Sequence, residues 1–296
     1  MPDSADAARP STGQAALDRL VSLLDLEQIE QDIFRGRSPD VSLQRVFGGQ
    51  VAGQALVAVG RSVPPERQAH SLHAYFLRPG DPSVPIVYLV DRIRDGRSFT
   101  TRRVVAVQHG KPIFNLSASF AVSEPGLDHQ VPMPDVPGPE ELPTLAERTA
   151  PYGDKLPINR LPRPIDLRYV DDPPWVSRGS GPREPTARVW MRADGVLPDD
   201  PLVHVCALTY ASDMTLLDSV LAAHGLAWHL DEVVGASLDH AMWFHRPFRA
   251  DEWLLYDCES PSAAGARGLA TGRIFAADGR LVVSVVQEGL LRTRRK

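Results

Sequence analysis

Apolar residues recur along the chain in two patterns, one typical of helices and one typical of strands. Near the N-terminus four of them have helical spacing and predict a short amphipathic helix over residues 14–25: Leu17, Leu20, Val21 and Leu24. Two longer helix-like runs begin at Val46 (VFGGQVAGQALVAVGRSV) and at Leu202 (LVHVCALTYASDMTLLDSVLAA). Asp200 followed by Pro201 predicts the start of the latter helix, because aspartate caps helices and proline is tolerated at the first helical position.

Each long helix is followed by similar strand-like segments. HAYFLRP begins at His73 and HAMWFHRP at His240, and each precedes an alternating pair of strands with a glycine at its tip. Matching Gly110 to Gly279 gives an offset of 169 residues, and matching His73 to His240 gives 167. The same order at a nearly constant offset predicts an internal duplication. Each copy is expected to be a helix packed on an antiparallel sheet, an α+β fold, with hairpins at 109–111 and 278–280.

A proline-rich segment separates the two copies. Fourteen of the 27 prolines fall between residues 125 and 185, which predicts a mostly extended connector with short strands near 167–170. We therefore expect an N-terminal unit at 14–124, a linker at 125–185 and a C-terminal unit at 186–296.

Composition and charge narrow the functional classes. The chain has 296 residues, a net charge of −5 and a pI near 6.0, so it lacks the overall positive charge that nucleic-acid binding favours. No apolar run approaches the roughly 20 residues that span a bilayer, and the N-terminus does not resemble a secretory signal. Two cysteines do not make a disulfide framework. These features predict a cytoplasmic protein without a membrane span or nucleic-acid partner.

Three polar residues of the second copy stand out against apolar surroundings to different degrees. Asp213 lies in the second long helical run and is costly to bury unpaired, although a solvated position is the alternative. Gln287 interrupts an apolar strand, where an amide could also bridge strands, and Ser237 is undistinguished by itself. At the offset of 169, the residue equivalent to Gln287 is Ala118. In the first copy, Gly48-Gly49 opens the helix, where it either admits a ligand to free N–H groups or packs closely against a strand.

Several motifs in one order resemble the acyl-CoA thioesterase II family, which includes bacterial thioesterase II and peroxisomal long-chain enzymes. They are RVFGGQVAGQAL, HSLHAYFLRPGD, DGRSFTTRRV, YASD, DHAMWFHRPF, ARG and VQEGLLR. The resemblance implies a double hotdog fold, hydrolysis of fatty acyl-CoA to free fatty acid and CoA, and no metal or organic cofactor. It also implies a catalytic triplet of Asp213, Ser237 and Gln287, with serine where bacterial thioesterase II has threonine.

Hotdog sites form between facing units, so we expect one composite site per chain. Backbone donors near Gly49 and Gln50 of the first copy would bind the thioester oxygen, and the second copy would activate water through the triplet. His70 and His240 are further candidate substrate-binding residues, and a structural hydrogen bond is the alternative for His70.

The sequence fits other enzyme classes less well. A serine hydrolase needs a G-x-S-x-G elbow, which the sequence lacks. His70 and His73 would point to opposite faces of a strand, which disfavours a metal site. A hotdog enoyl-CoA hydratase and a non-catalytic acyl-CoA-binding protein stay open as alternatives. The resemblance and exposed sheet edges favour a homodimer or homotetramer.

Five arginines of the first copy either bind CoA phosphates or lie on a solvated strand face. They are Arg92, Arg94, Arg97, Arg102 and Arg103.

Overall fold

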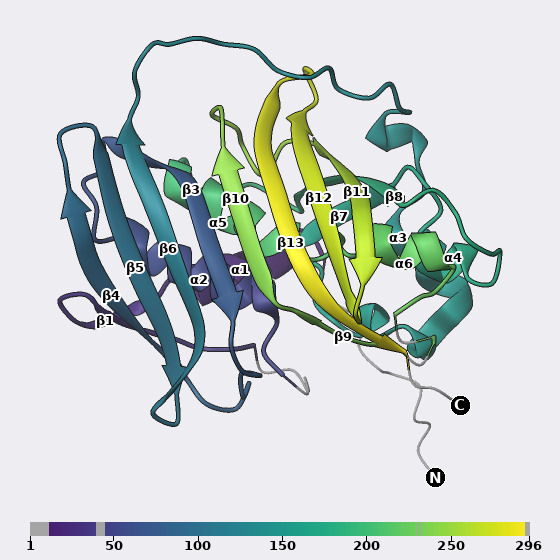
Figure 1. Ribbon diagram of the computed structural model, residues 1–296, viewed down its shortest axis with the longest axis horizontal. Helices are drawn as coiled ribbons and strands as arrows, with labels where there is room; N and C mark the ends of the chain where they lie inside the picture. Colours follow the sequence, from purple (N-terminus) through teal and green to yellow (C-terminus); the bar gives the residue numbers. More distant parts are fainter. Residues whose placement is uncertain (1–11, 40–44, 229, 232, 294–296) are drawn as a thin grey trace.

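Two antiparallel half-sheets join edge to edge into one continuous sheet (Figure 1). The computed structural model describes residues 12–39, 45–228, 230–231 and 233–293. The first half consists of β1 (Glu27–Glu30), β2 (Ile33–Gly36), β3 (Arg67–Phe76), β4 (Ile86–Asp95), β5 (Phe99–Gln108) and β6 (Lys111–Val122). The second consists of β7 (Ile165–Tyr169), β8 (Thr186–Ala193), β9 (Val233–Ser237), β10 (Asp239–Phe244), β11 (Leu254–Ala264), β12 (Arg267–Ala276) and β13 (Leu281–Thr293).

The strand order reads β1-β2-β4-β5-β6-β3-β10-β13-β12-β11-β8-β7, with β9 pairing to β13. The order β2-β4-β5-β6-β3 in one direction matches β8-β11-β12-β13-β10 in the other. The two copies are therefore related by an approximate two-fold axis at the β3–β10 junction, and the predicted duplication is confirmed.

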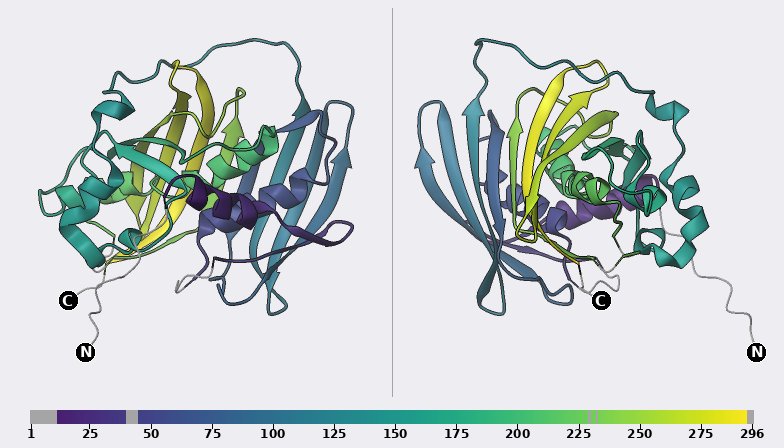
Figure 2. Two further views of the ribbon diagram at one scale, coloured as in Figure 1. Left: turned by 180° about the vertical axis from the view of Figure 1, so that it is seen from behind. Right: turned by 45° about the vertical axis from the view of Figure 1, so that its right-hand side comes forward.

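The long helices pack on one face of this sheet (Figure 2). They are α1 (Gln14–Leu24), α2 (Gly48–Gly60) and α5 (Pro201–Ser212), and shorter helices are α3 (Leu145–Thr149), α4 (Pro174–Ser177) and α6 (Asp218–His224). Asp200 caps α5 by accepting a hydrogen bond from the Leu202 N–H at 2.9 Å. The predicted N-terminal helix, helix α2 and the start of α5 are thus confirmed.

Helices α2 and α5 run antiparallel and in close contact because α2 presents glycine to its partner. A Cβ atom on Gly49 would lie 2.3 Å from the Tyr210 carbonyl oxygen, and one on Gly53 would lie 3.1 Å from the Cys206 carbonyl oxygen. Residues 49–59 of α2 are all buried. The helix pair therefore forms the centre of the molecule, with the sheet curved around one side.

The tight turn at 109–110 confirms the first predicted hairpin. His109 and Gly110 both have positive φ (50° and 69°), as a two-residue type I′ turn requires. In the second copy Gly279 has φ 89° and lies between β12 and β13, which confirms the second hairpin.

The proline-rich segment differs in part from the expected extended connector. Residues 123–138 cross one end of the sheet as an arch without helix or strand (Figure 1). Short helical turns follow at Pro139–Glu141, Ala150–Lys155 and Pro157–Asn159, together with α3 and α4. Proline at the first positions of these turns favours their start, which explains why a proline-rich sequence is helical here. The strand expected near 167–170 is β7, which pairs with β8.

The strand register corrects the matching of His73 with His240. His73 is exposed and lies opposite Ala241, whereas His240 is buried and lies opposite Ala74. The two-fold axis exchanges the pair Leu72–Met242 with the pair Ala74–His240, so the first-copy equivalent of His240 is Leu72. The extra residue in HAMWFHRP relative to HAYFLRP concealed this one-residue shift, which changes the face of the sheet.

No helix within the described ranges combines the length and the apolar composition needed to cross a bilayer.

Candidate active site

Asp213 lies directly after the last residue of α5, not in the middle of a helix as the apolar run suggested. It is the C-terminal cap, with φ −83° and ψ −1°, and α6 begins five residues later. The N–H of Met214 donates to the Ala211 carbonyl at 3.0 Å, a tighter turn than the α-helix makes. The helix is thus interrupted where the second copy carries its acid, and the carboxylate projects from a turn.

The structure brings the three predicted catalytic side chains together at one carboxylate oxygen. Asp213 Oδ1 accepts a hydrogen bond from Ser237 Oγ at 3.0 Å and another from Gln287 Nε2 at 2.7 Å. Asp213 and Ser237 are half-buried and Gln287 is fully buried. Within the described ranges no donor bonds Oδ2, so one oxygen is held and the other is free.

Strand β13 supports both partners of the acid. Gln287 points from β13 toward the helices, and Ser237 is the last residue of β9, opposite Gly289 of the same strand. Leu238 separates β9 from β10 and is fixed on both sides: its N–H donates to the Glu288 carbonyl and its carbonyl accepts from the Phe76 N–H, each at 2.9 Å. The hydroxyl and the amide are therefore held by a sheet rather than by a loose loop.

Gly48 of the first copy provides the opposite wall of the site. A Cβ atom there would lie 2.6 Å from Asp213 Oδ2 and 2.8 Å from the Phe76 ring, so the absence of a side chain leaves room at the free oxygen. The N–H of Val51 is bonded to the Phe47 carbonyl, and helix geometry gives the N–H groups of residues 48–50 no such partner within the helix. The partially positive end of α2 thus faces the carboxylate.

Gly49 and Gln50 have their side-chain positions directed away from Asp213. The missing side chain of Gly49 serves the contact with α5 described above, and Gln50 Nε2 donates to the Arg37 carbonyl at 3.1 Å. Their backbone N–H groups belong to the first turn of α2, where the helix itself offers them no acceptor. Gly48 and Gly49 are adjacent in the sequence, but their side-chain positions face different neighbours.

The structure does not bring His70 together with Asp213. His70 Nε2 lies 2.8 Å from Ser119 Oγ, and the His70 ring packs on Phe99 at 5.5 Å between centroids. Ser119 alternates with the buried Ala118 and Phe120, so this contact is on the outer face of the sheet, away from the helices. Partial burial lowers the pKa of His70. A bulge between Ala69 and Ser71 brings His70 to the same face as His73, contrary to the opposite faces predicted from spacing.

His240 lies beneath the site rather than at its surface. Its side chain is 1% exposed, and its Nε2 atom is 2.8 Å from Ser212 Oγ, next to the acid in sequence. Burial lowers the pKa of His240, while the Asp213 carboxylate and the Gln287 amide act in the opposite direction. Ser212 was not singled out from the sequence, because a serine within an apolar helix carries no distinguishing pattern.

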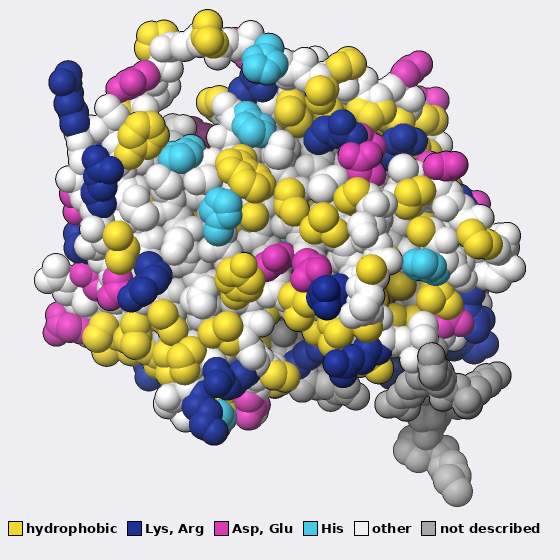
Figure 3. All heavy atoms as spheres, in the orientation of Figure 1, with side chains coloured by type: hydrophobic (Ala, Val, Ile, Leu, Met, Phe, Trp, Pro, Cys, Tyr) yellow, Lys and Arg dark blue, Asp and Glu magenta, His cyan; other side chains and the backbone are white. Residues whose placement is uncertain are grey.

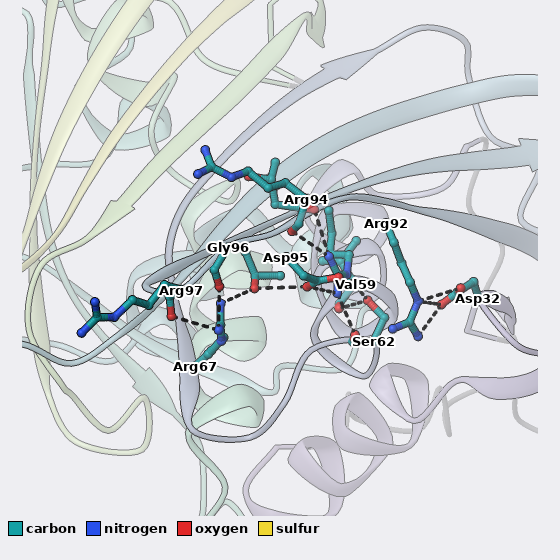
Figure 4. A network of polar contacts seen from close by, with 12 residues as sticks. Asp32, Val59, Ser62, Arg67, Arg92, Arg94, Asp95, Gly96 and Arg97 are labelled. Atoms are coloured by element: carbon teal, nitrogen blue, oxygen red, sulfur yellow. Dashed lines mark hydrogen bonds and ion pairs between the residues drawn. The ribbon is translucent and has the colours of Figure 1, made fainter.

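The five arginines divide between structural and surface roles. Arg102 is buried and donates to Ser62 Oγ at 3.0 Å and to Asp95 Oδ1 at 2.7 Å, which ties the end of α2 to the β4–β5 hairpin. Figure 4 shows this network around Ser62 and Asp95, with the separate Arg92–Asp32 ion pair beside it. Arg102 is therefore not available to a phosphate.

Comparisons with known proteins show the family to which the chain belongs. Residues 36–121 match the family model described as the acyl-CoA thioesterase N-terminal domain, and residues 160–290 match the acyl-CoA thioesterase model. Acyl-coenzyme A thioesterase 8 of Homo sapiens is 42% identical and is aligned over 96% of each chain. Acyl-CoA thioesterase 2 of Haemophilus influenzae is 39% identical over 93% of this chain and 98% of its own.

A solved structure gives the same result in three dimensions. The acyl-CoA thioesterase II of Mycobacterium marinum has a TM-score of 0.76 and 46% identity, over 93% of this chain and 97% of its own. The fold and these matches together define a double hotdog thioester hydrolase. The chain belongs to the acyl-CoA thioesterase II family, as the sequence motifs predicted, and the hydratase and non-catalytic alternatives are not favoured.

Proposed function

We propose that this chain hydrolyses fatty acyl-CoA to free fatty acid and CoA, with Asp213 as the general base. The observation that carries the proposal is the difference between the two carboxylate oxygens of Asp213. Its Oδ1 atom accepts from Ser237 and Gln287, whereas Oδ2 faces the start of α2 beside Gly48. A water molecule bound at Oδ2 would lie between a base and a set of backbone donors.

Each side chain of the triplet has a separate task in this reaction. Asp213 accepts a proton from water as the water attacks the thioester carbonyl. The Ser237 hydroxyl donates a hydrogen bond to Asp213 Oδ1 and keeps lone pairs that accept a hydrogen bond from the water. The Gln287 amide has two N–H groups, of which one holds Asp213 and the other is left for the water oxygen.

The start of α2 supplies the complementary charge. The thioester oxygen becomes negative when water adds, and we propose that the N–H groups of Gly49 and Gln50, in the first turn of α2, donate to it. A preorganised donor of this kind contributes about 3–4 kcal/mol to the stability of a transition state. The thiolate of CoA then leaves, and the proton taken by Asp213 is passed to it.

A panel of acyl-CoA substrates of different chain length, with detection of free thiol, tests the proposal. We expect one thiol released for each thioester consumed. An enoyl-CoA in the same panel tests the hydratase alternative, because hydration removes the conjugated double bond without releasing thiol. Absence of thiol release from every substrate would overturn the proposed function.

We also propose a cytoplasmic location and a homodimer or homotetramer. Cys206 and Cys258 are buried free thiols, as suits a reducing compartment. The outer face of the sheet exposes large apolar side chains, including Tyr75, Leu89 and Phe99, among scattered histidines (Figure 3). Light scattering coupled to size-exclusion chromatography measures the assembly, and a monomer would contradict this proposal.

A further inference from the structure

His240 and Gln287 are neighbours across two paired strands. Ala241 of β10 lies opposite Val286 of β13, and the antiparallel register places His240 opposite Gln287 on the helix-facing side of the sheet. Cross-strand neighbours have Cβ atoms about 4.5–5.5 Å apart, which brings their polar ends within reach of each other. His240 is 1% exposed and Gln287 is 0% exposed, so water does not compete freely for either.

Each of these side chains has one buried polar atom without a hydrogen-bond partner among the described residues. The atoms are Nδ1 of His240 and Oε1 of Gln287. Burying an unsatisfied polar group costs about 1–3 kcal/mol. Two such atoms on facing side chains are therefore unexpected unless one donates a hydrogen bond to the other. A neutral imidazole with its proton on Nδ1 is the donor that an amide oxygen requires.

The other ends of both side chains are already engaged. Gln287 Nε2 donates to Asp213 Oδ1 at 2.7 Å, and His240 Nε2 lies 2.8 Å from Ser212 Oγ. Ser212 has one proton and three acceptors within reach: His240 Nε2, the Thr209 carbonyl at 3.0 Å and, as a weak acceptor, the Met242 sulfur at 3.5 Å. When the proton goes to His240 Nε2, the imidazole proton is on Nδ1 and faces the Gln287 oxygen.

The alternative tautomer of His240, with its proton on Nε2, would disturb the hydrogen bond between Gln287 and Asp213. If Ser212 donated to Thr209, His240 would carry its proton on Nε2 and present a lone pair from Nδ1 to Gln287. The amide would then have to turn its N–H groups toward His240 and its oxygen toward the Asp213 carboxylate. Two acceptors would face each other at the base, which is unfavourable in a buried site.

The first copy lacks both partners at the equivalent positions. Leu72 and Ala118 lie opposite each other on β3 and β6, where the second copy has His240 and Gln287. Both are buried. The first copy, which has no equivalent of the Asp213 site, thus has an apolar pair here. The fold itself does not require a histidine at this position, and the histidine occurs where the amide occurs.

We infer that His240 is a positioning residue: its Nδ1–H group donates to Gln287 Oε1 and thereby fixes the amide with its N–H groups toward Asp213 and the water. The inference rests on the proposed function, because the amide matters only if Asp213 activates water. The chain of donors runs from Ser212 through His240 and Gln287 to Asp213. His240 itself touches neither water nor substrate.

A set of substitutions at His240 tests the role of the Nδ1 donor. In His240→Asn the amide nitrogen occupies the place of Nδ1, in His240→Gln it occupies the place of Nε2, and His240→Leu copies Leu72 of the first copy. We expect kcat to fall about ten- to a hundred-fold in His240→Leu and His240→Gln with KM within three-fold, and His240→Asn to regain most of this loss. Equal losses in the Asn and Leu variants would overturn the inference.

A double-mutant cycle separates positioning from a general structural role. In a Gln287→Ala background, His240→Leu should change kcat by less than about two-fold, because the amide that it positions is gone. Independent, multiplicative losses would contradict the inference. His245→Leu is the matched control, since it removes a similar histidine–serine contact, from His245 Nε2 to Ser284 Oγ at 2.8 Å, on the outer face.

The wild-type protein provides a test that no folding defect can obscure. Nitrogen-15 NMR of histidine-labelled protein should show His240 as a neutral imidazole protonated at Nδ1, and a proton on Nε2 would overturn the inference. If the wild-type protein releases no thiol from acyl-CoA, the proposed function fails. If it is active but the tautomer or the cycle disagrees, only the role of His240 fails.

Discussion

At the scale of single residues, the site depends on how each oxygen of Asp213 is occupied. Oδ1 is held by two donors from β9 and β13, and Oδ2 is left toward the start of α2. A carboxylate bonded on both oxygens would be a poor base, and one bonded on neither would rotate. The arrangement orients the acid without using Oδ2, the oxygen that we propose receives the proton of water.

Replacement of Gln287 by alanine is expected to lower kcat more than it raises KM. The amide orients the acid and the water, and loss of such an orienting group costs on the order of a hundred-fold in rate. Steady-state kinetics on one good acyl-CoA measure both constants. The first copy tolerates alanine at its equivalent position, Ala118, which is also buried, so the strand should persist. A ten-fold rise in KM with unchanged kcat would make Gln287 a binding residue instead.

Gly48 and Gly49 are expected to respond differently to alanine. In Gly48→Ala the new methyl group would displace the Asp213 carboxylate, so kcat should fall about a hundred-fold while the melting temperature changes little. In Gly49→Ala it would push α2 away from the Tyr210 carbonyl, which we expect to cost about 1–3 kcal/mol of stability. Kinetics and thermal melts of the two variants form a matched pair. If both variants lose stability and activity together, the division of roles is wrong.

At the scale of elements, α6 begins with a buried acid, Asp218, that the proposed reaction does not use. Asp218 accepts hydrogen bonds from Trp228 Nε1 at 3.0 Å and from the Tyr169 hydroxyl at 3.3 Å. Burial raises its pKa to about 7, although these two hydrogen bonds act to lower it. Asp218 thus joins α6 to β7 and to the loop that precedes β9.

Because burial raises the pKa of Asp218, we predict that the free energy of unfolding falls as the pH rises. An aspartate in the unfolded chain ionises near pH 4, so between about pH 4 and pH 7 the folded state binds the extra proton. The free energy of unfolding should decrease through this window and stay lower above it. Asp218→Asn should melt at a higher temperature than the wild type at pH 8, and the difference should shrink as the pH falls and nearly vanish at about pH 4. Identical pH profiles for the two proteins would contradict this prediction.

The elements themselves could largely be predicted from local patterns. The duplicated helices and hairpins depend on apolar periodicity and on glycines such as Gly110, and both are visible in the sequence. The interruption of the second helix at Asp213 is not, because apolar residues continue through Leu216 and Leu217 and i→i+3 bonding leaves no sequence pattern. The bulge at His70 cannot be predicted from the sequence either, because one extra residue reverses the faces of a strand without changing its composition.

The site was predictable to the extent that its residues break a pattern. Gln287 stands out because a buried amide is unusual in an apolar strand, and Asp213 stands out for a similar reason. Ser237 has no such signal, and the family motif alone pointed to it. The pairing of His240 with Gln287 depends on strand register, which the sequence gives only to within a residue.

At the scale of the whole molecule, the two-fold axis relates a copy with the polar pair His240–Gln287 to a copy with the apolar pair Leu72–Ala118. Each copy supplies one strand of the β3–β10 junction and one helix of the α2–α5 pair. The acid, the hydroxyl and the amide of the candidate site come from the second copy, and Gly48 comes from the first. We expect one productive site per chain. Titration with a non-hydrolysable thioether analogue of acyl-CoA should give one equivalent bound per chain, and two equal sites would contradict the composite site.

The most direct test of the account is the acyl-CoA hydrolysis rate of Asp213→Asn against the wild type, with thermal melts of both. The amide is nearly isosteric with the carboxylate but cannot accept the proton of water. We expect kcat to fall by about 10²–10⁴-fold, the range that a general base contributes, while the melting temperature stays close to that of the wild type. Activity within a few-fold of the wild type would contradict the assignment of Asp213 as the base.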